Sequence, residues 1–415
     1  MKKRKTGLKI LFVHQNCPGQ FKHLAPALAA EGHEVVFIGQ KNKPTPAGVK
    51  RLEYEPHRKV TPNMHPYLVG TEAAVLNGQA VARLSMSLKG KGFVPDVMIG
   101  NPGWGETLFL KDVWPDSPLI QLSEFYYNGR GADVGFDPEF HAGPDAVLRA
   151  RIRSAQHLLA IEAADLSYAP TEWQKQQFPK PYHAKLRVIH DGIDVDAIKP
   201  DPAAVFALPN GANLTRQDEV LTYVSRNLEP YRGFHSFMRA LPRILADRPN
   251  AQVVIVGGDD VSYGGRPKEG GTWRDKMLTE TGPLPDRVHF TGRIPYDAYV
   301  RLMQVSTAHV YLTYPFVLSW SMLEAMAAGA FVIGSATAPV EEIIRDGENG
   351  WLVDFFDINA LAARVSDGLA QGHGMDALRD AARATVVDCF ALSSCLAAQR
   401  ALIDEAIAGA SKALG

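Results

Sequence analysis

Apolar runs alternate with helical patterns along most of this chain. The clearest case lies between His309 and Asp354, where a run rich in β-branched and aromatic residues precedes a short loop, an Ala- and Met-rich run ending at Gly329, and a second apolar run. This order predicts strand, loop, helix and strand, which together form a parallel βαβ unit. Because ligands bind beyond the carboxyl ends of the strands in such units, we expect the loop at 315–321 and the first turn of the helix to face a pocket.

The amino-terminal half shows the same alternation. Strands are predicted at 8–13, 34–38, 96–99 and 119–122, and helices at 21–31, at 71–88 and, as one long amphipathic helix leading into a strand, from about 145. Pro26 conflicts with the helix at 21–31 and predicts a local kink. Thr171 is expected to be a helix N-cap, with Glu172 in the first turn.

A stretch with Gly and Pro punctuation at 195–215 is the expected domain boundary. The alternation then restarts, with strands predicted at 220–224, 252–256 and 288–290 and a helix at 233–247. The Gly-rich segment at 259–271 is expected to be a flexible loop. At 415 residues the chain exceeds one ordinary core, so we expect two successive α/β domains.

Composition limits the classes of partner. With 46% apolar and 21% charged residues the chain is expected to be globular, and its net charge of -1 gives no overall field that favours nucleic acid or membrane. Any anion site must therefore be local. Cys17, Cys389 and Cys395 lack metal-ligand spacing and suit a reducing cytoplasm. The basic start MKKRKTG is interpreted as a solubilising tail, and contact with anionic lipid is the alternative.

Two arginines mark the candidate chemistry of the second domain. Arg226 and Arg232 flank a loop at the carboxyl end of the first strand, on the same sheet edge as the helix start at Ser319, Trp320 and Ser321. Guanidinium groups match phosphate geometry, and free backbone N–H groups at a helix start attract anions. The sequence therefore predicts a diphosphate clamp at this edge.

Two acidic features have competing interpretations. Glu324 follows Ser321 at the spacing of a capping box, which is favoured on spacing alone over a role in binding sugar hydroxyls. Asp194 and Asp196 form an Asp-x-Asp pair, but without other hard ligands nearby a turn is favoured over a metal site.

The first domain offers weaker signals. Only Gly19 lies where a dinucleotide fingerprint would need three glycines, although Pro18, Gly19 and Gln20 allow close backbone approach to a ligand. The strands before NPGWGE (101–106) and before SEFYYNGRG (123–131) end in Gly, aromatic and acidic residues. These loops either contact a ligand or form a rim without one, and the residues do not decide between the two.

Several stretches resemble the retaining glycosyltransferases of family 4. LEAMAAGAFVIGSATAPVEEIIRDGENGWLV is similar to their nucleotide-sugar site, SRNLEPYRG to their basic clamp, VHFTGRIP to their base-binding segment, and GHEVVFI and VIHDGID to their amino-domain strands. The resemblance implies the GT-B fold, in which two Rossmann-like domains with parallel sheets face each other. It gives an amino-terminal acceptor domain at 1–200, a nucleotide-sugar domain at 201–391, and a helix at 392–415 that returns to the first domain.

The resemblance also implies roles for particular residues. The catalytic set is Arg226, Arg232 and Asn101. The donor-binding set is Gly19, Gln20, Gly257, Arg293, Ile294, Ser319, Trp320, Ser321 and Glu324, with Glu324 on the ribose and Arg293 and Ile294 on the base. The acceptor-binding set is His14, Trp104, Glu124 and Tyr126. No metal and no cofactor beyond the nucleoside diphosphate sugar is implied.

Three departures from the family pattern bear on function. The family's earlier glutamate falls here on Phe316, and Asn101 stands where many members have a histidine. The interval from Arg226 to Arg232 is one residue longer than the commoner spacing. The first departure leaves the donor sugar open, and the first two raise the question of catalytic competence.

The resulting hypothesis is a cytoplasmic enzyme that transfers a sugar, from a UDP-sugar by family frequency, to a hydroxyl of a glycan, lipid-linked or small-molecule acceptor with front-face retention. An intermediate of envelope polysaccharide assembly is one such acceptor, and peripheral contact with the inner face of the membrane is an accompanying expectation. The alternatives are a catalytically impaired nucleotide-sugar-binding protein and a GT-B-fold sugar epimerase or phosphorylase.

Overall fold

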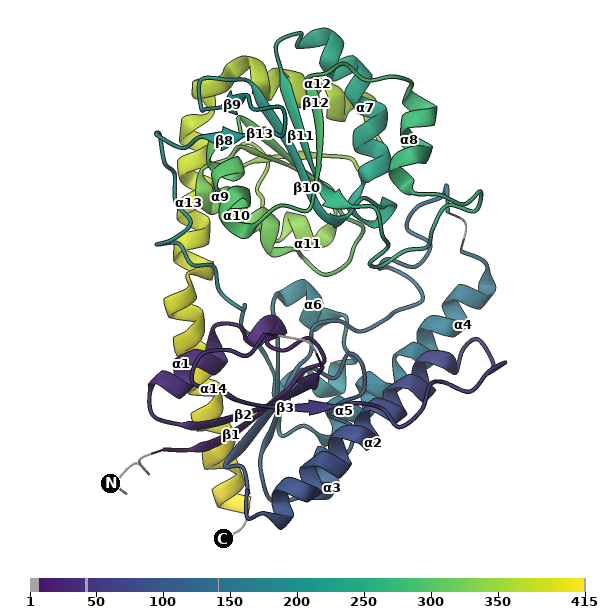
Figure 1. Ribbon diagram of the computed structural model, residues 1–415, viewed down its shortest axis with the longest axis vertical. Coiled ribbons are helices and arrows are strands. Elements are labelled where there is room, and N and C mark those ends of the chain that lie inside the picture. Colours follow the sequence, from purple (N-terminus) through teal and green to yellow (C-terminus); the bar gives the residue numbers. More distant parts are fainter. Residues whose placement is uncertain (1–6, 42–43, 141, 414–415) are drawn as a thin grey trace. The chain divides into compact units, whose positions relative to one another are not determined.

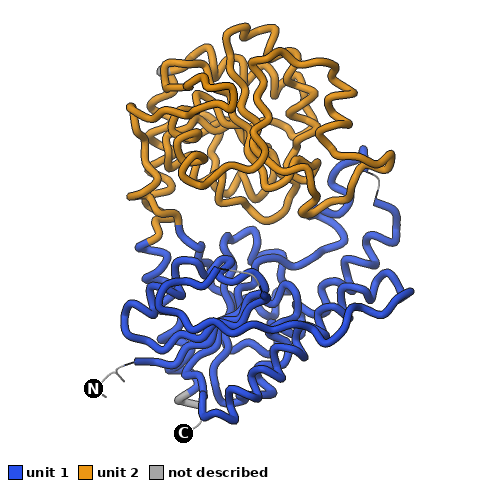
Figure 2. The backbone as a smooth tube through the Cα atoms, viewed as in Figure 1, with its two compact units in different colours: residues 1–192, 393–415 blue, residues 193–392 orange. Residues whose placement is uncertain are grey.

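The computed structural model describes residues 7–41, 44–140 and 142–413. The basic start of the chain lies largely outside this range. The chain divides into two compact units, one formed by residues 1–192 with 393–415 and the other by residues 193–392 (Figure 2). Among the described residues, no helix combines the length and apolar character needed to cross a membrane.

Unit 1 contains a seven-stranded parallel sheet in the order β3-β2-β1-β4-β5-β6-β7, of which Figure 1 labels β1, β2 and β3. Its strands are β1 (Lys9–Val13), β2 (Glu34–Gln40), β3 (Lys50–Tyr54), β4 (Val97–Gly100), β5 (Leu119–Leu122), β6 (Leu166–Ala169) and β7 (Leu186–Val188). Its helices are η1 (Gly19–Phe21), α1 (Leu24–Ala30), α2 (Val69–Gly90), α3 (Leu110–Val113), α4 (Pro144–Arg153), α5 (Ala155–Ala163), α6 (Glu172–Gln176), η2 (Lys180–Lys185) and α14 (Leu392–Ala413).

The two faces of this sheet bury alternate residues of each strand, as the strand period of two requires. On one face, Ile10 and Phe12 pack with α1 and with Leu402 and Ile403 of α14. On the other face, residues such as Leu11 pack with α2 and α3. The last helix therefore belongs to the core of unit 1, as the family resemblance implies.

Unit 2 contains a six-stranded parallel sheet in the order β12-β11-β10-β13-β14-β15 and a short antiparallel hairpin, β8-β9. The strands are β8 (Phe206–Ala207), β9 (Asn213–Leu214), β10 (Val220–Asn227), β11 (Gln252–Gly258), β12 (Val288–Gly292), β13 (Ala308–Tyr311), β14 (Val332–Ser335) and β15 (Trp351–Val353). The helices are η3 (Pro230–Arg232), α7 (Phe234–Asp247), α8 (Trp273–Thr281), α9 (Tyr296–Val305), α10 (Trp320–Ala328), α11 (Ala338–Glu341), α12 (Ile358–Gln371), η4 (Gly372–Met375) and α13 (Asp376–Phe390).

One face of the second sheet packs against α9, α10 and α13, which contribute Leu302, Met322 and Val386 to a common core. On the opposite face of the sheet, the ring of Tyr223 in β10 stacks on Phe237 of α7, with 4.9 Å between ring centroids. The central strands β13 and β14 are buried along their whole length, which is typical of a parallel sheet covered on both faces.

Several predicted elements differ in detail. The first helix begins at Leu24 rather than 21, so Pro26 lies in its first turn, where the missing N–H removes no helical hydrogen bond and no kink is needed. The predicted long helix from 145 is divided into α4 and α5 at Ser154, whose hydroxyl donates to the Tyr127 carbonyl at 2.7 Å. Thr171 is an N-cap as predicted.

Candidate functional site

A cavity of about 70 Å³ lies at the carboxyl ends of β10 and β13 in unit 2. Four of the residues assigned to the predicted diphosphate clamp line it, namely Arg226, Arg232, Ser319 and Ser321. We call this space the β10–β13 cavity. The predicted clamp residues are therefore brought together around one cavity.

Arg232 is held in place from several sides. Its side chain is buried, and Nη1 donates to the Tyr311 hydroxyl at 3.1 Å and to Thr313 Oγ1 at 2.8 Å. The Tyr223 hydroxyl donates to the Arg232 carbonyl at 2.7 Å, which fixes the backbone as well. Burial lowers the pKa of Arg232, whereas the surrounding phenols, that of Tyr311 most of all, raise it. The net effect is a raised pKa. The Arg232 guanidinium therefore stays charged. Arg226, by contrast, is exposed at the end of β10.

The first turn of α10 differs from the prediction. Ser319 is the N-cap, and its backbone N–H donates to the Tyr311 hydroxyl at 2.8 Å. The N–H of Ser321 donates to Ser319 Oγ at 3.3 Å, and Trp320 packs against the core of unit 2. The expectation of free N–H groups at Ser319 and Ser321 is therefore wrong. This helix start still offers an anion its dipole and the two serine hydroxyls.

Glu324 is not part of a capping box, because the helix begins two residues earlier than that interpretation requires. Its carboxylate instead accepts a hydrogen bond from the Tyr296 hydroxyl at 2.6 Å, and the residue is 6% exposed. A carboxylate fixed by a neighbouring phenol is oriented for a further donor, such as a sugar hydroxyl.

The predicted base-binding segment is near the end of β11. Arg293 Nη2 donates to Asn227 Oδ1 at 2.9 Å, and the Arg293 side chain is mostly exposed. The glycine that allows this approach is Gly258, where a Cβ would lie 2.8 Å from Arg293 Nε. Gly257 instead faces Leu228, which a Cβ would approach to 2.8 Å. Ile294 packs against the core of unit 2.

Phe316, which replaces the family's earlier glutamate, packs among aromatic rings. Its ring centroid is 5.0 Å from that of Tyr263 and 5.6 Å from that of Tyr231, and Tyr231 is in turn 4.7 Å from Tyr314. Phe316 is 6% exposed. The position that carries a charge in the family therefore contributes here to an apolar wall.

Among the residues of the β10–β13 cavity that the sequence did not reveal are Glu229, Tyr263 and Tyr311. Glu229 lies inside the clamp motif and Tyr311 at the end of a predicted strand, which are the signals that were available. Tyr263 lies in the Gly-rich segment interpreted as a loop, and nothing in its local sequence marks it.

In unit 1, four predicted residues form one hydrogen-bonded group, which we call the His14 cluster: His14, Gln20, Asn101 and Glu124. His14 Nε2 is 2.6 Å from Gln20 Oε1, and Gln20 Nε2 donates to Glu124 Oε1 at 2.8 Å. Asn101 Nδ2 donates to the other Glu124 oxygen at 3.3 Å. His14, Asn101 and Glu124 follow the carboxyl ends of β1, β4 and β5, which is where a doubly wound sheet places ligand contacts, and Gln20 lies in η1.

The His14 imidazole is neutral. Its Nδ1 accepts from the Asn16 backbone N–H at 2.8 Å, so the proton is on Nε2 and is donated to Gln20. Burial lowers the pKa of His14 to about 4, although the hydrogen bond with Gln20 acts in the opposite direction. Gly19 has φ +52, and a Cβ there would lie 2.6 Å from the His14 ring. Glycine is therefore required for the ring to sit beside the η1 turn.

The remaining predicted residues of the first domain separate into two groups. The Trp104 ring is 5.3 Å from the His14 ring and borders the cluster. Tyr126 is not brought to the cluster, because it packs against Phe178 with 5.4 Å between ring centroids. Glu106, also in the NPGWGE loop, is fully buried and accepts from the Tyr54 hydroxyl at 2.7 Å.

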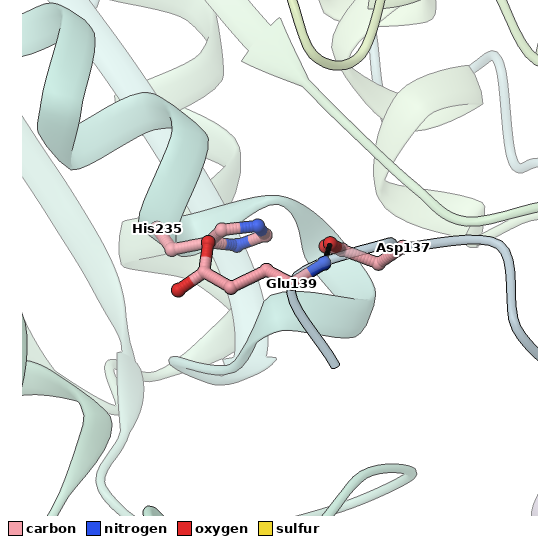
Figure 3. Close-up of side chains that lie close together, drawn as sticks. All are labelled: Asp137, Glu139 and His235. Carbon is pink, nitrogen blue, oxygen red and sulfur yellow. Dashed lines mark hydrogen bonds between the residues drawn. The ribbon is translucent and has the colours of Figure 1, made fainter. Parts of the chain in front are cut away.

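Other acidic groups have local structural roles. Asp194 Oδ1 accepts from the Ala197 N–H at 3.0 Å, as in a turn. In the loop after β5, the Glu139 N–H donates to Asp137 Oδ1 at 2.9 Å (Figure 3). His235, also drawn there, belongs to the first turn of α7 in unit 2, where its ring lies 5.9 Å from that of Phe355.

Comparison with known families decides the class. The model of the Glycosyl transferase family 4 group matches residues 31–198, and the model of the Glycosyl transferases group 1 matches residues 210–385. The chain belongs to glycosyltransferase family 4. The two matches together cover most of both units, so the membership expected from the motifs is confirmed.

Curated relatives of this family 4 chain are similar over part of their length. The phosphatidyl-myo-inositol mannosyltransferase of Mycobacterium tuberculosis is 28% identical over 195 residues, which are 46% of this chain and 46% of the relative. The D-inositol 3-phosphate glycosyltransferase of a Nocardioides species is 26% identical over 231 residues, 53% of this chain and 48% of the relative. The chain thus spans about half the length of these relatives.

Solved structures share the fold of this family 4 chain. Sucrose-phosphate synthase from Thermosynechococcus elongatus superposes with a TM-score of 0.74 at 18% identity, covering 97% of this chain and 100% of that one. Anabaena Alr3699/HepE, in complex with UDP and glucose, gives 0.67 at 17% identity, with 96% and 100% covered. These likenesses confirm the predicted α/β fold of the GT-B class.

Proposed function

We propose that this chain is a glycosyltransferase that moves a sugar from a nucleoside diphosphate sugar to a hydroxyl group. The observation that carries the proposal is the convergence of Arg226 and Arg232 on one cavity, beside the first turn of α10. Guanidinium groups keep their charge and match phosphate oxygens, so the pair suits the charge that grows on a leaving diphosphate. The names of the curated relatives support the same reaction class.

For the donor we propose a UDP-sugar, supported by the structural relative that holds UDP and glucose. The proposed reaction retains configuration by front-face transfer. The bond from the sugar's anomeric carbon to the diphosphate oxygen breaks, a bond to the acceptor oxygen forms on the same face, and the acceptor proton passes to the leaving diphosphate. This route needs neither a protein nucleophile nor a metal, so the work of the chain is binding, orientation and stabilisation of charge.

For the acceptor we propose the His14 cluster and Trp104 as the recognition surface. The Gln20 amide and the Glu124 carboxylate of the cluster are partly exposed and suit hydroxyl groups, while the buried His14 imidazole and Asn101 amide hold them in place through hydrogen bonds. We expect a glycan, lipid-linked or small-molecule acceptor in the cytoplasm, with peripheral membrane contact if the acceptor is lipid-linked.

The test is a thermal-shift panel of nucleoside diphosphates and their sugars, followed by an assay of acceptor-dependent release of nucleoside diphosphate. A ligand that binds only the folded state raises the melting temperature. UDP or a UDP-sugar is expected to give the largest shift. If no nucleoside diphosphate shifts the transition at millimolar concentration, the proposal is wrong.

One observation favours a second candidate, a nucleotide-sugar-binding protein without transfer activity. Phe316 packs against Tyr263 and Tyr231 at the position of the family's earlier glutamate, so that carboxylate is absent. Donor binding without release of nucleoside diphosphate, across acceptors that carry free hydroxyls, would distinguish this candidate from a transferase.

A further inference from the structure

The loop at 259–271 is attached to the rest of unit 2 through one buried carboxylate. Glu229, which is 1% exposed, accepts hydrogen bonds from three successive backbone N–H groups, those of Ser262 at 3.1 Å, Tyr263 at 3.2 Å and Gly264 at 2.9 Å. Hydrogen bonds to an ionised acceptor are about twice as strong as neutral ones. This segment, which the sequence predicted to be flexible, is therefore held at its middle.

Two further contacts hold the loop, at Ser262 and at Gly265. Asn227 Nδ2 donates to Ser262 Oγ at 2.7 Å, and Trp273 Nε1 donates to the Gly265 carbonyl at 2.8 Å. Asn227 also binds Arg293, so the loop and the predicted base-binding segment share a partner. The loop thus borders the predicted donor-binding site of unit 2.

The consequence of this attachment is the position of Tyr263. Tyr263 lines the β10–β13 cavity, and its ring centroid lies 5.2 Å from the Arg232 guanidinium carbon. Phe316 packs against the ring at 5.0 Å and restricts its movement. A guanidinium has five donors and no acceptor, so it offers no partner to the phenol's own hydrogen. The phenol can therefore donate this hydrogen to an anionic oxygen in the cavity.

We propose that Tyr263 is an additional donor-binding residue, whose phenol donates a hydrogen bond to a phosphate oxygen of the nucleoside diphosphate, and that Glu229 is the positioning residue that holds it there. This inference rests on the proposed function, because it assumes that a nucleoside diphosphate enters the cavity. It extends the site to two residues that the family motifs do not mark as ligand contacts.

The first test measures UDP affinity by calorimetry for wild type, Tyr263→Phe, Glu229→Gln and the double variant. A hydrogen bond to a charged group contributes about 1.5–3 kcal/mol, so Tyr263→Phe is expected to weaken UDP binding by about tenfold to a hundredfold. Glu229→Gln places an amide where three N–H donors need an acceptor, and a similar loss is expected. If Glu229 acts through Tyr263, the double variant binds UDP no more weakly than Tyr263→Phe alone, whereas independent effects would add.

The second test is amide hydrogen exchange over residues 262–264. Glu229→Gln is expected to accelerate this exchange at least about tenfold. Glu269→Gln is the matched control, since Glu269 lies on the same loop but is exposed, and its carboxylate pairs with Lys276 rather than with the N–H groups of residues 262–264. Unchanged exchange in Glu229→Gln, or an equal change in the control, would overturn the positioning role.

The outcomes separate this inference from the proposed function. If wild type binds no nucleoside diphosphate, the proposed function fails and this inference with it. If wild type binds UDP and Tyr263→Phe binds it equally well, only this inference fails. Tyr263→Phe keeps the ring contacts with Phe316, so it tests the phenol even if Glu229→Gln does not fold.

Discussion

Glu106 provides a quantitative test of the NPGWGE loop that borders the His14 cluster. Its carboxyl group is buried, one oxygen accepts from the Tyr54 hydroxyl, and the other has no hydrogen-bond partner among the described residues. Burial raises the pKa of Glu106 to about 7, against an ordinary value of 4.5. The folded protein therefore holds this proton over a pH range in which the unfolded chain releases it.

The sign of the effect follows from proton linkage. When the folded state binds more protons than the unfolded state, the free energy of unfolding falls as pH rises. The shift from 4.5 to about 7 corresponds to about 3 kcal/mol at 1.36 kcal/mol per unit. Wild type should thus lose about 3 kcal/mol relative to Glu106→Gln between pH 4.5 and pH 8, with most of the change between pH 5 and pH 7.

The assay is urea unfolding of wild type and Glu106→Gln at pH 4.5, 6 and 8. Buried histidines such as His14, whose pKa is lowered to about 4, contribute a pH dependence of the opposite sign. That contribution is common to both proteins and cancels in the difference. A difference in the free energy of unfolding that stays constant with pH would refute the buried, protonated state of Glu106.

Three further predictions concern single contacts. Tyr296→Phe removes the hydroxyl that orients Glu324, so UDP binding should weaken about tenfold while the binding of inorganic diphosphate is unchanged. Equal losses of affinity for both ligands would contradict the proposed contact of Glu324 with the ribose. Gly19→Ala should lower the free energy of unfolding by about 1–3 kcal/mol in urea, because its Cβ would meet the His14 ring, and an unchanged midpoint would count against that geometry. Thr171→Ala should cost about 1 kcal/mol by the same measurement, since its hydroxyl accepts an N–H in the first turn of α6.

Much of the fold follows from local sequence patterns. The central strands of both sheets are buried on two faces, so their apolar runs are visible in the sequence, and the chain order of strand and helix predicts parallel sheets. The strand β3 was missed because Lys50–Tyr54 is a polar edge strand with only one buried residue. The break between α4 and α5 was missed; Ser154, where it occurs, contacts the Tyr127 carbonyl 27 positions earlier, and no local pattern indicates such a contact.

The candidate site was predictable to the same extent. Arg226, Arg232 and the start of α10 converge because each follows a parallel strand of one sheet, and the carboxyl ends of such strands meet at one edge. The contacts that refine the site are not local. Tyr311 uses the N–H group of Ser319, and Glu229 holds residues 33 to 35 positions later, which no spacing in the sequence indicates.

The central claim is that two guanidinium groups on one cavity bind a diphosphate, and calorimetric titration with UDP tests it most directly. Arg226→Ala and Arg232→Ala are compared with wild type and with Arg301→Ala, which removes an exposed arginine paired with Asp297 on α9. Each clamp variant should bind UDP about tenfold to a hundredfold more weakly, while the control binds as wild type does. Wild-type affinity in Arg226→Ala and in a folded Arg232→Ala would contradict the account.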